Sequence, residues 1–298
     1  MNLKITTIQT DLHWENVAKN LEMFAAKITA ITEETDVIVL PEMFNTGFSM
    51  DSEKLAETMD GVTVTWMKEQ SEKANAVIVG SLIVRVDSFE AFTSVKHAQG
   101  ATLFYNRLVW VQPDGVISTY DKRHLFRMAN EQEHFTAGTQ RLIINYKGWR
   151  ICPLVCYDLR FPVWARNKQL SVDSCQLSGS QEQKTNNSQR NSNVYDILIY
   201  IANWPAVRKA PWSKLLEARA IENQCYVVGV NRVGVDGTGK DYSGNSVIIN
   251  PKGNPITTIP ENEKSCVTSN LSMNELTDFR KAFPVGLDGD EFDFPISK

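Results

Sequence analysis

Short runs of apolar residues alternate with amphipathic stretches along the first third of the chain. The runs Leu3–Gln9, Val37–Leu40 and Ala76–Val84 are apolar enough to predict buried strands. Apolar residues at helical spacing between them predict helices over about Asn16–Ile31 and Val64–Ala74. Strands that alternate with helices in this way favour parallel strands joined by right-handed crossovers.

The pattern changes further on, where paired strands with turn residues between them predict antiparallel hairpins. The predicted hairpins are Thr102–Val111 with Gly115–Tyr120, Arg141–Tyr146 with Trp149–Val155, and Val247–Asn250 with Pro255–Thr258. Strands are also predicted at Asp196–Ile201 and Tyr226–Val230, and helices at Pro211–Gln224 and Met273–Phe283. No linker or repeat divides the chain, so we expect one domain over residues 1–298.

One internal segment breaks the pattern. Residues 169–193 are rich in Ser, Gln and Asn and poor in apolar side chains, which predicts a polar, mobile surface loop inserted into the domain. A lid over a neighbouring site is the alternative interpretation. The segment from Asp87 to Gly100 carries only a weak signal, and the chain ends in an acidic stretch, Asp288 to Asp293.

Composition excludes several classes of protein. The net charge of −4 gives no electrostatic footprint for nucleic acid or for an anionic membrane. No run approaches the roughly 20 apolar residues that span a bilayer, and the first residues lack the apolar core of a signal peptide. We therefore expect a cytoplasmic protein with neither nucleic-acid nor membrane partners.

The five cysteines are an odd number without a disulfide-like spacing, which fits a reducing compartment. Cys152 and Cys156 resemble half a zinc site, but no second pair of ligands follows, and the four histidines are scattered. We expect no metal and no cofactor.

Three polar side chains follow predicted strands. Cys156 lies where Ile151–Val155 ends and a helix-like run, Val163 to Asn167, begins; a helix start exposes a nucleophile and lowers the pKa of a thiol. Glu42 follows Val37–Leu40, and Lys122 follows the first hairpin. Taken singly, each has a plain alternative: a buried structural cysteine, a loop carboxylate and a surface charge. Together they form a plausible triad of general base, electrostatic stabiliser and nucleophile.

The stretches around these residues resemble the nitrilase superfamily of carbon–nitrogen hydrolases, and within it the ω-amidase branch. The resemblance is carried by Leu40–Phe44, Tyr120–Phe126, Cys156–Pro162, Ala202–Pro205, Ala218–Asn223 and Asn231–Gly234, in the family's order. It implies an α-β-β-α sandwich, with two sheets face to face and helices outside. It also implies a homodimer or larger homo-oligomer, formed through the helix after the nucleophile and the C-terminal segment.

The resemblance further implies a second glutamate in the site, at Glu131 in preference to Glu133, which orients Lys122 or the substrate. In the implied reaction, Glu42 takes the thiol proton of Cys156. Lys122 and the backbone N–H of Tyr157 then hold the oxyanion of the attacked amide, and a thioester follows.

The ω-amidase branch implies small ω-amides of 2-oxo dicarboxylates, such as 2-oxoglutaramate or 2-oxosuccinamate. Arg160 and Arg123 are candidates for the substrate carboxylate, with structural salt bridges as the alternative role, and Asn203 and Trp204 are expected in the substrate site. Two other readings stay open. One is another activity of the superfamily, such as a nitrilase, an N-carbamoyl amino-acid hydrolase or an acyltransferase; the other is a non-catalytic binding protein on the same fold.

Overall fold

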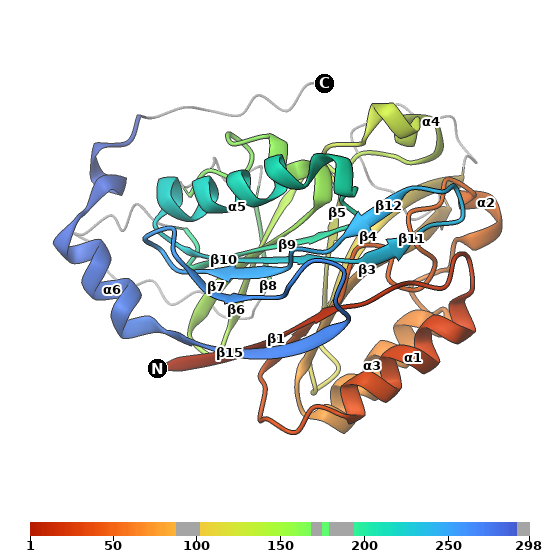
Figure 1. Cartoon of the computed structure of the whole chain (residues 1–298), viewed down its shortest axis with the longest axis horizontal. Coiled ribbons are helices and arrows are strands. Elements are labelled where there is room, and N and C mark those ends of the chain that lie inside the picture. Colours follow the sequence, from red (N-terminus) through yellow and green to blue (C-terminus); the bar gives the residue numbers. More distant parts are fainter. Residues whose placement is uncertain (88–101, 168–174, 179–193, 291–298) are drawn as a thin grey trace.

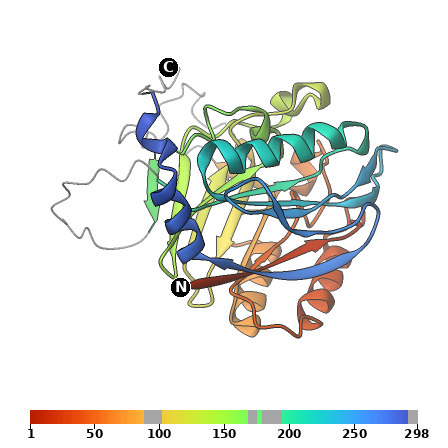
Figure 2. The same ribbon diagram turned by 60° about the vertical axis from the view of Figure 1, so that its left-hand side comes forward.

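The computed structural model describes residues 1–87, 102–167, 175–178 and 194–290. Within these residues two large sheets lie face to face, with helices on both outer faces (Figure 1). Helices α1 and α3 cover one sheet, and α5 lies across the other, as the turned view in Figure 2 also shows. The predicted α-β-β-α sandwich is therefore confirmed.

The first sheet has the strand order β15-β1-β2-β3-β4-β5 in the described chain. Strands β1, β2 and β3 are parallel, and β15 and β4 flank them antiparallel. The bounds are β1 (Asn2–Gln9), β2 (Val37–Val39), β3 (Val77–Asp87), β4 (Thr102–Val111), β5 (Ile117–Asp121) and β15 (Ser265–Ser272). The outer helices are α1 (Val17–Thr29) and α3 (Val62–Ala74).

The second sheet has the order β14-β13-β10-β9-β7-β6-β8, with β7, β9 and β10 parallel. Its strands are β6 (Arg141–Tyr146), β7 (Trp149–Val155), β8 (Cys175–Ser178), β9 (Ile197–Ala202), β10 (Tyr226–Asn231), β13 (Val247–Ile249) and β14 (Pro255–Thr258). The remaining regular elements are α2 (Ser52–Leu55), α4 (Glu131–His134), α5 (Lys209–Asn223), α6 (Met273–Ala282), the small ribbon of β11 (Val233–Val235) and β12 (Asp241–Ser243), and the 3-10 turns η1 (Arg127–Ala129), η2 (Cys156–Arg160), η4 (Ala206–Arg208) and η5 (Val285–Asp288).

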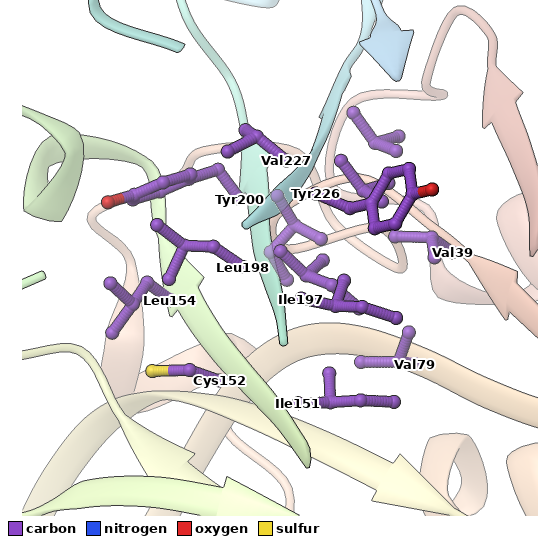
Figure 3. Packing of buried hydrophobic residues seen from close by; sticks show 14 of the residues in the cluster. Val39, Val79, Ile151, Cys152, Leu154, Ile197, Leu198, Tyr200, Tyr226 and Val227 are labelled. Carbon is purple, nitrogen blue, oxygen red and sulfur yellow. The ribbon is translucent and has the colours of Figure 1, made fainter. Parts of the chain in front are cut away.

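The alternation of side chains along β2 explains why the sheets stack. Val37 and Val39 point into the core between the sheets, whereas Ile38 and Leu40 pack under α1 and α3. Figure 3 shows Val39 against residues of the second sheet. A strand buried on both faces has no polar positions, which is why it reads as a continuous apolar run. Each such side chain contributes about 1.5–3 kcal/mol on burial.

The directions of the strands bring the polar residues that follow them to one edge of each sheet. Strand β5 is antiparallel to β4, which is antiparallel to β3, so β5 runs in the direction of β2 and β3. Glu42 and Lys122 therefore follow carboxyl ends on the same edge of the first sheet, and Cys156 follows the carboxyl end of β7 in the second. This edge is where open α/β sheets collect ligands.

Some predictions about elements were wrong. Val163–Asn167 is a set of turns, and the helical residues are instead those of η2, from Cys156 itself. Phe161, at φ −114° and ψ 87°, ends the helical backbone, because the ring of Pro162 disfavours helical backbone at the residue before it.

Part of the predicted polar loop is also a strand: β8 pairs with β6 at the edge of the second sheet. The other residues of the 169–193 insert, the weak segment 88–101 and the last residues of the acidic tail lie outside the described chain. Of the helices in the described residues, none has the length and apolarity to span a bilayer.

Candidate active site

The nucleophile candidate occupies a sharp turn. Cys156 follows β7 directly and has a left-handed backbone, with φ +44°. A side chain other than glycine is held in this region only where its surroundings enforce it. The residue is almost entirely buried, with 8% of its surface exposed, and its thiol opens into a cleft.

A buried cluster of charged side chains lies beside the thiol. The ammonium of Lys122 donates hydrogen bonds to Glu42 Oε1 at 2.9 Å and to both oxygens of Glu131, each at 2.9 Å. All three side chains are inaccessible to solvent. The Cys156 thiol lies close enough to the Glu42 carboxylate for that carboxylate to act on the pKa of the thiol. The structure thus brings together Glu42, Lys122, Glu131 and Cys156 from separate elements.

Burial and charge act in opposite directions within this cluster. Burial lowers the pKa of Lys122, but the carboxylates of Glu131 and Glu42 outweigh it and hold the ammonium charged, with its pKa above the ordinary value. Burial raises the pKa of Glu131 and, joined by the charge of Glu42, prevails over the pull of Lys122. One ammonium is therefore shared by two carboxylates in a dry site.

The expectation of a lowered thiol pKa was wrong. Burial, followed by the charge of Glu42, raises the pKa of Cys156 well above its ordinary value, although Lys122 acts in the other direction. The five-residue turn η2 offers little helix dipole to oppose these effects. Cys156 is consequently a neutral thiol that needs a base.

Backbone and amide groups fix the orientation of Glu42. Asn106 Nδ2 donates to Glu42 Oε1 at 2.8 Å, and the backbone N–H of Asn203 donates to Oε2 at 2.8 Å. Asn203 Nδ2 also donates to the backbone carbonyl of Glu42. Because Asn203 follows β9 of the second sheet, these bonds join the two sheets across the site.

Asp158 ties the lysine segment to the cysteine turn. Its Oδ2 accepts from the hydroxyl of Tyr120 at 2.7 Å and from the N–H of Val155 at 3.1 Å. Its Oδ1 accepts from the backbone N–H of His124 at 3.0 Å. This buried carboxylate therefore links the backbone on both sides of Lys122, at Tyr120 and His124, to the strand that ends at Cys156.

A cleft of about 280 Å³ opens above Cys156. The four residues expected in the substrate site all line it: Tyr157, Arg160, Asn203 and Trp204. Arg160 lies over the indole of Trp204, 5.2 Å from the ring centroid. Arg123 is not among the lining residues; its guanidinium donates to the carbonyl of Gly138 and lies over Trp164. Glu133 is exposed on α4, away from Lys122.

Sequence reasoning missed several residues that the structure places here. Asn106, which contacts Glu42 and Glu131, is a buried polar residue inside the apolar strand β4, and that mismatch was a detectable signal. Phe48, Arg208 and Lys240, from loops and a 3-10 turn, and Tyr242, from the short strand β12, also line the cleft without such a signal, and Phe126 lines it from the end of the recognised stretch Tyr120–Phe126. In the described part of the chain, no group of three or more His, Cys, Asp or Glu side chains is arranged to hold a metal ion.

Comparison with known proteins places the chain in a family. The family model described as "Carbon-nitrogen hydrolase" matches residues 4–281. The chain is 43% identical to the omega-amidase YafV of Escherichia coli K12, over 97% of this chain and 98% of that protein. It is 27% identical to the 2-oxoglutaramate amidase of Bacillus subtilis, over 96% of each.

Among solved structures, XC1258 from Xanthomonas campestris, a CN-hydrolase superfamily protein with an arsenic adduct in its active site, superposes with a TM-score of 0.86. It is 38% identical, over 99% of each chain. The similarity therefore extends over nearly the whole chain and includes the fold. The chain belongs to the carbon–nitrogen hydrolase family.

Proposed function

We propose that this protein is an ω-amidase that releases ammonia from a small carboxylated amide through a cysteine thioester. The observation that carries the proposal is the position of the Cys156 thiol, which lines a cleft and lies beside the ion pair of Glu42 and Lys122. Similarity to the omega-amidase of Escherichia coli over nearly the whole chain supports the same reaction.

The reaction begins with proton transfer. Glu42 takes the thiol proton as the Cys156 sulfur attacks the amide carbon, which solves the problem of a thiol whose pKa is raised by burial. The carbonyl oxygen becomes an oxyanion, stabilised by the Lys122 ammonium and the backbone N–H of Tyr157. Protonated Glu42 then donates to the nitrogen, the carbon–nitrogen bond breaks, and ammonia leaves.

Water completes the cycle. Glu42 takes a proton from a water molecule as the water oxygen attacks the thioester carbon. The carbon–sulfur bond then breaks, and protonated Glu42 returns the proton to the Cys156 sulfur. Glu131 holds the Lys122 ammonium through both carboxylate oxygens. In this role Glu131 is a positioning residue, since it keeps the lysine aimed at the oxyanion rather than paired with Glu42 alone.

The proposed substrates are ω-amides of 2-oxo dicarboxylates, such as 2-oxoglutaramate or 2-oxosuccinamate. The guanidinium of Arg160 is exposed at the cleft and receives the substrate carboxylate, while Trp204 and Asn203 form the adjoining wall. The odd number of cysteines fits a cytoplasmic enzyme. The family resemblance supports a homodimer or larger homo-oligomer, which sedimentation of the purified protein would test.

The test is a panel of substrates scored by ammonia release: carboxylated ω-amides, uncharged amides, nitriles and N-carbamoyl amino acids. The proposal expects the highest kcat/KM on the carboxylated ω-amides. Preference for a nitrile or a carbamoyl amino acid would replace it with another activity of the superfamily. If nothing in the panel is hydrolysed and no thiol-directed acylating probe gives a stoichiometric burst, the protein is a binding protein on this fold.

A further inference from the structure

The charges around the cleft are unbalanced. Among the described residues that line it, three are cationic, Arg160, Arg208 and Lys240, and none is an aspartate or a glutamate. The acids of the site, Glu42 and Glu131, lie buried beneath and are occupied by Lys122. The cleft is therefore an anion-attracting surface, with more positive charge than one substrate carboxylate requires.

Elsewhere in the described chain, arginines that are shielded from water either pair with an acid or, as Arg123 and Arg166 do, donate to a backbone carbonyl. Ion pairs join Arg107 to Asp121, Arg150 and Arg280 to Asp196, Arg219 to Glu222, and Arg232 to Asp11. Arg208 is half-buried, yet its side chain has no carboxylate partner among the described residues. Removing part of a guanidinium from water without a counter-charge costs free energy, and an anionic ligand would recover it.

The backbone of Arg208 is held firmly in place. The indole N–H of Trp204 donates to the carbonyl of Arg208 at 2.7 Å, and the Arg208 N–H donates to the carbonyl of Pro205 at 2.9 Å. The guanidinium lies over the ring of Phe126, 5.2 Å from its centroid. Stacking on an aromatic face restrains the side chain without neutralising its charge.

Trp204 connects the two arginines of the cleft. Its ring lies beneath Arg160, and its indole nitrogen is bonded to the backbone of Arg208. We propose that Arg208 is a specificity-determining residue that binds the substrate carboxylate together with Arg160. A planar guanidinium can donate two parallel hydrogen bonds to a carboxylate, and two such groups select a carboxylated amide over an uncharged amide of equal length. This inference rests on the proposed function.

The test compares glutaramate with pentanamide, which carries a methyl group in place of the carboxylate. Arg208→Gln should lower kcat/KM for glutaramate by about 10- to 100-fold, mainly through KM, because a hydrogen bond to a charged group is lost. The same variant should hydrolyse pentanamide at the wild-type rate. Arg208→Lys should recover part of the loss, since it restores the charge but not the two-pronged geometry.

Lys209→Gln is the matched control, because Lys209 is the next residue, is exposed and is paired with Glu261 instead of lining the cleft. It should leave both rates unchanged. Equal losses on both amides in Arg208→Gln, or no loss on either, would overturn the inference and leave Arg208 a structural residue or a bystander.

A binding measurement separates this inference from the proposed reaction. In the Cys156→Ala background, calorimetric titration with glutarate should show affinity that Arg208→Gln weakens by a similar factor. If the wild-type protein hydrolyses no carboxylated amide but glutarate binding still depends on Arg208, the proposed function fails while the anion site stands. If Arg208→Gln leaves the affinity for glutarate unchanged, Arg208 is not part of an anion site, whichever amides the enzyme hydrolyses.

Discussion

Two buried ionic clusters lie at opposite ends of the strands and are balanced in opposite ways. At the carboxyl ends, one ammonium, Lys122, is shared by the carboxylates of Glu42 and Glu131. At the amino ends of β7 and β9, one carboxylate, Asp196, is shared by the guanidiniums of Arg150 and Arg280. The first has an excess of acid beside the Cys156 thiol at a cleft, and the second has an excess of base and influences only the fully buried thiol of Cys225, which does not line that cleft.

Their pKa values reflect the difference. Burial raises the pKa of Asp196, but Arg150 and Arg280 overcome it and hold the carboxyl below its ordinary value. For Glu131, burial prevails and the pKa is raised. A carboxylate surrounded by guanidiniums keeps its charge and stabilises the fold, whereas carboxylates that compete for one ammonium in a dry site are ready to exchange protons.

The largest expected effect is that of removing the proposed nucleophile, Cys156. Cys156→Ala should abolish turnover, down to the background rate, and leave the fold intact, because only a small side chain at a cleft is lost. Ammonia release and a melting curve would be measured together. Retained activity in this variant would show that the nucleophile has been misassigned.

Lys122→Met should be nearly as damaging. Losing one donor to the oxyanion typically costs about 3–4 kcal/mol of transition-state stabilisation, or a fall of roughly 10²- to 10³-fold in kcat. Lys122→Arg should not restore the rate, because a planar guanidinium cannot replace a compact ammonium in a tight site. Activity within a few fold of wild type in either variant would contradict the role.

Lys122→Met should also change the pH dependence of the reactivity of Cys156. Since Lys122 acts to lower the pKa of Cys156, its removal should shift alkylation of that thiol by iodoacetamide to higher pH than in the wild-type protein. An unchanged pH profile would mean that the ammonium does not reach the sulfur.

At the cluster around Asp196, Asp196→Asn should lower the free energy of unfolding and leave kcat unchanged. Breaking a buried pair costs about 3–5 kcal/mol, and we expect about 2–3 kcal/mol because Arg150 is one-third exposed and screened by water. The lowered folded-state pKa means that this stabilisation is present above the unfolded pKa of about 4 and is lost as the pH falls through the folded value.

Urea unfolding of wild type and Asp196→Asn at several pH values would measure that difference. The gap in unfolding free energy should be constant near neutral pH and close at strongly acid pH. A fall in kcat per folded molecule, with stability unchanged, would reverse the assignment of the two clusters.

The smallest expected effect is that of Cys152→Ala; Cys152 lies on β7, four residues before Cys156. Cys152 is fully buried in the core between the layers, so the truncation should cost about 1 kcal/mol of stability and leave kcat unchanged. It is the matched control for Cys156→Ala. Loss of activity in Cys152→Ala alone would exchange the roles of the two cysteines.

The sequence predicted elements best where burial is complete. Strands such as β2, buried on both faces, give continuous apolar runs, and their carboxyl ends mark the chemical edge. Strand β15 was missed because most of its side chains are partly exposed and polar, and because its partner, β1, lies at the other end of the chain. Pairing at that distance leaves no local pattern.

The site divides in the same way. Glu42, Lys122 and Cys156 follow predicted strands, so the fold class implied that they would meet. The raised pKa of Cys156 was not predictable, because it depends on how deeply the turn is packed. Arg208 was missed because it lies three residues beyond Pro205, where the recognised motif stops. Only its position in the lining of the cleft indicates a role in binding.

The charge of the cleft lining has a consequence for the amino acids that carry the same terminal amide. Glutamine and asparagine present an ammonium group beside their carboxylate, and the described residues of the lining offer that ammonium three cations and no acid. A 2-oxo group in its place is uncharged and accepts hydrogen bonds from a guanidinium. We therefore expect kcat/KM for the amide of the 2-oxo acid to exceed that for the amino acid with the same terminal amide.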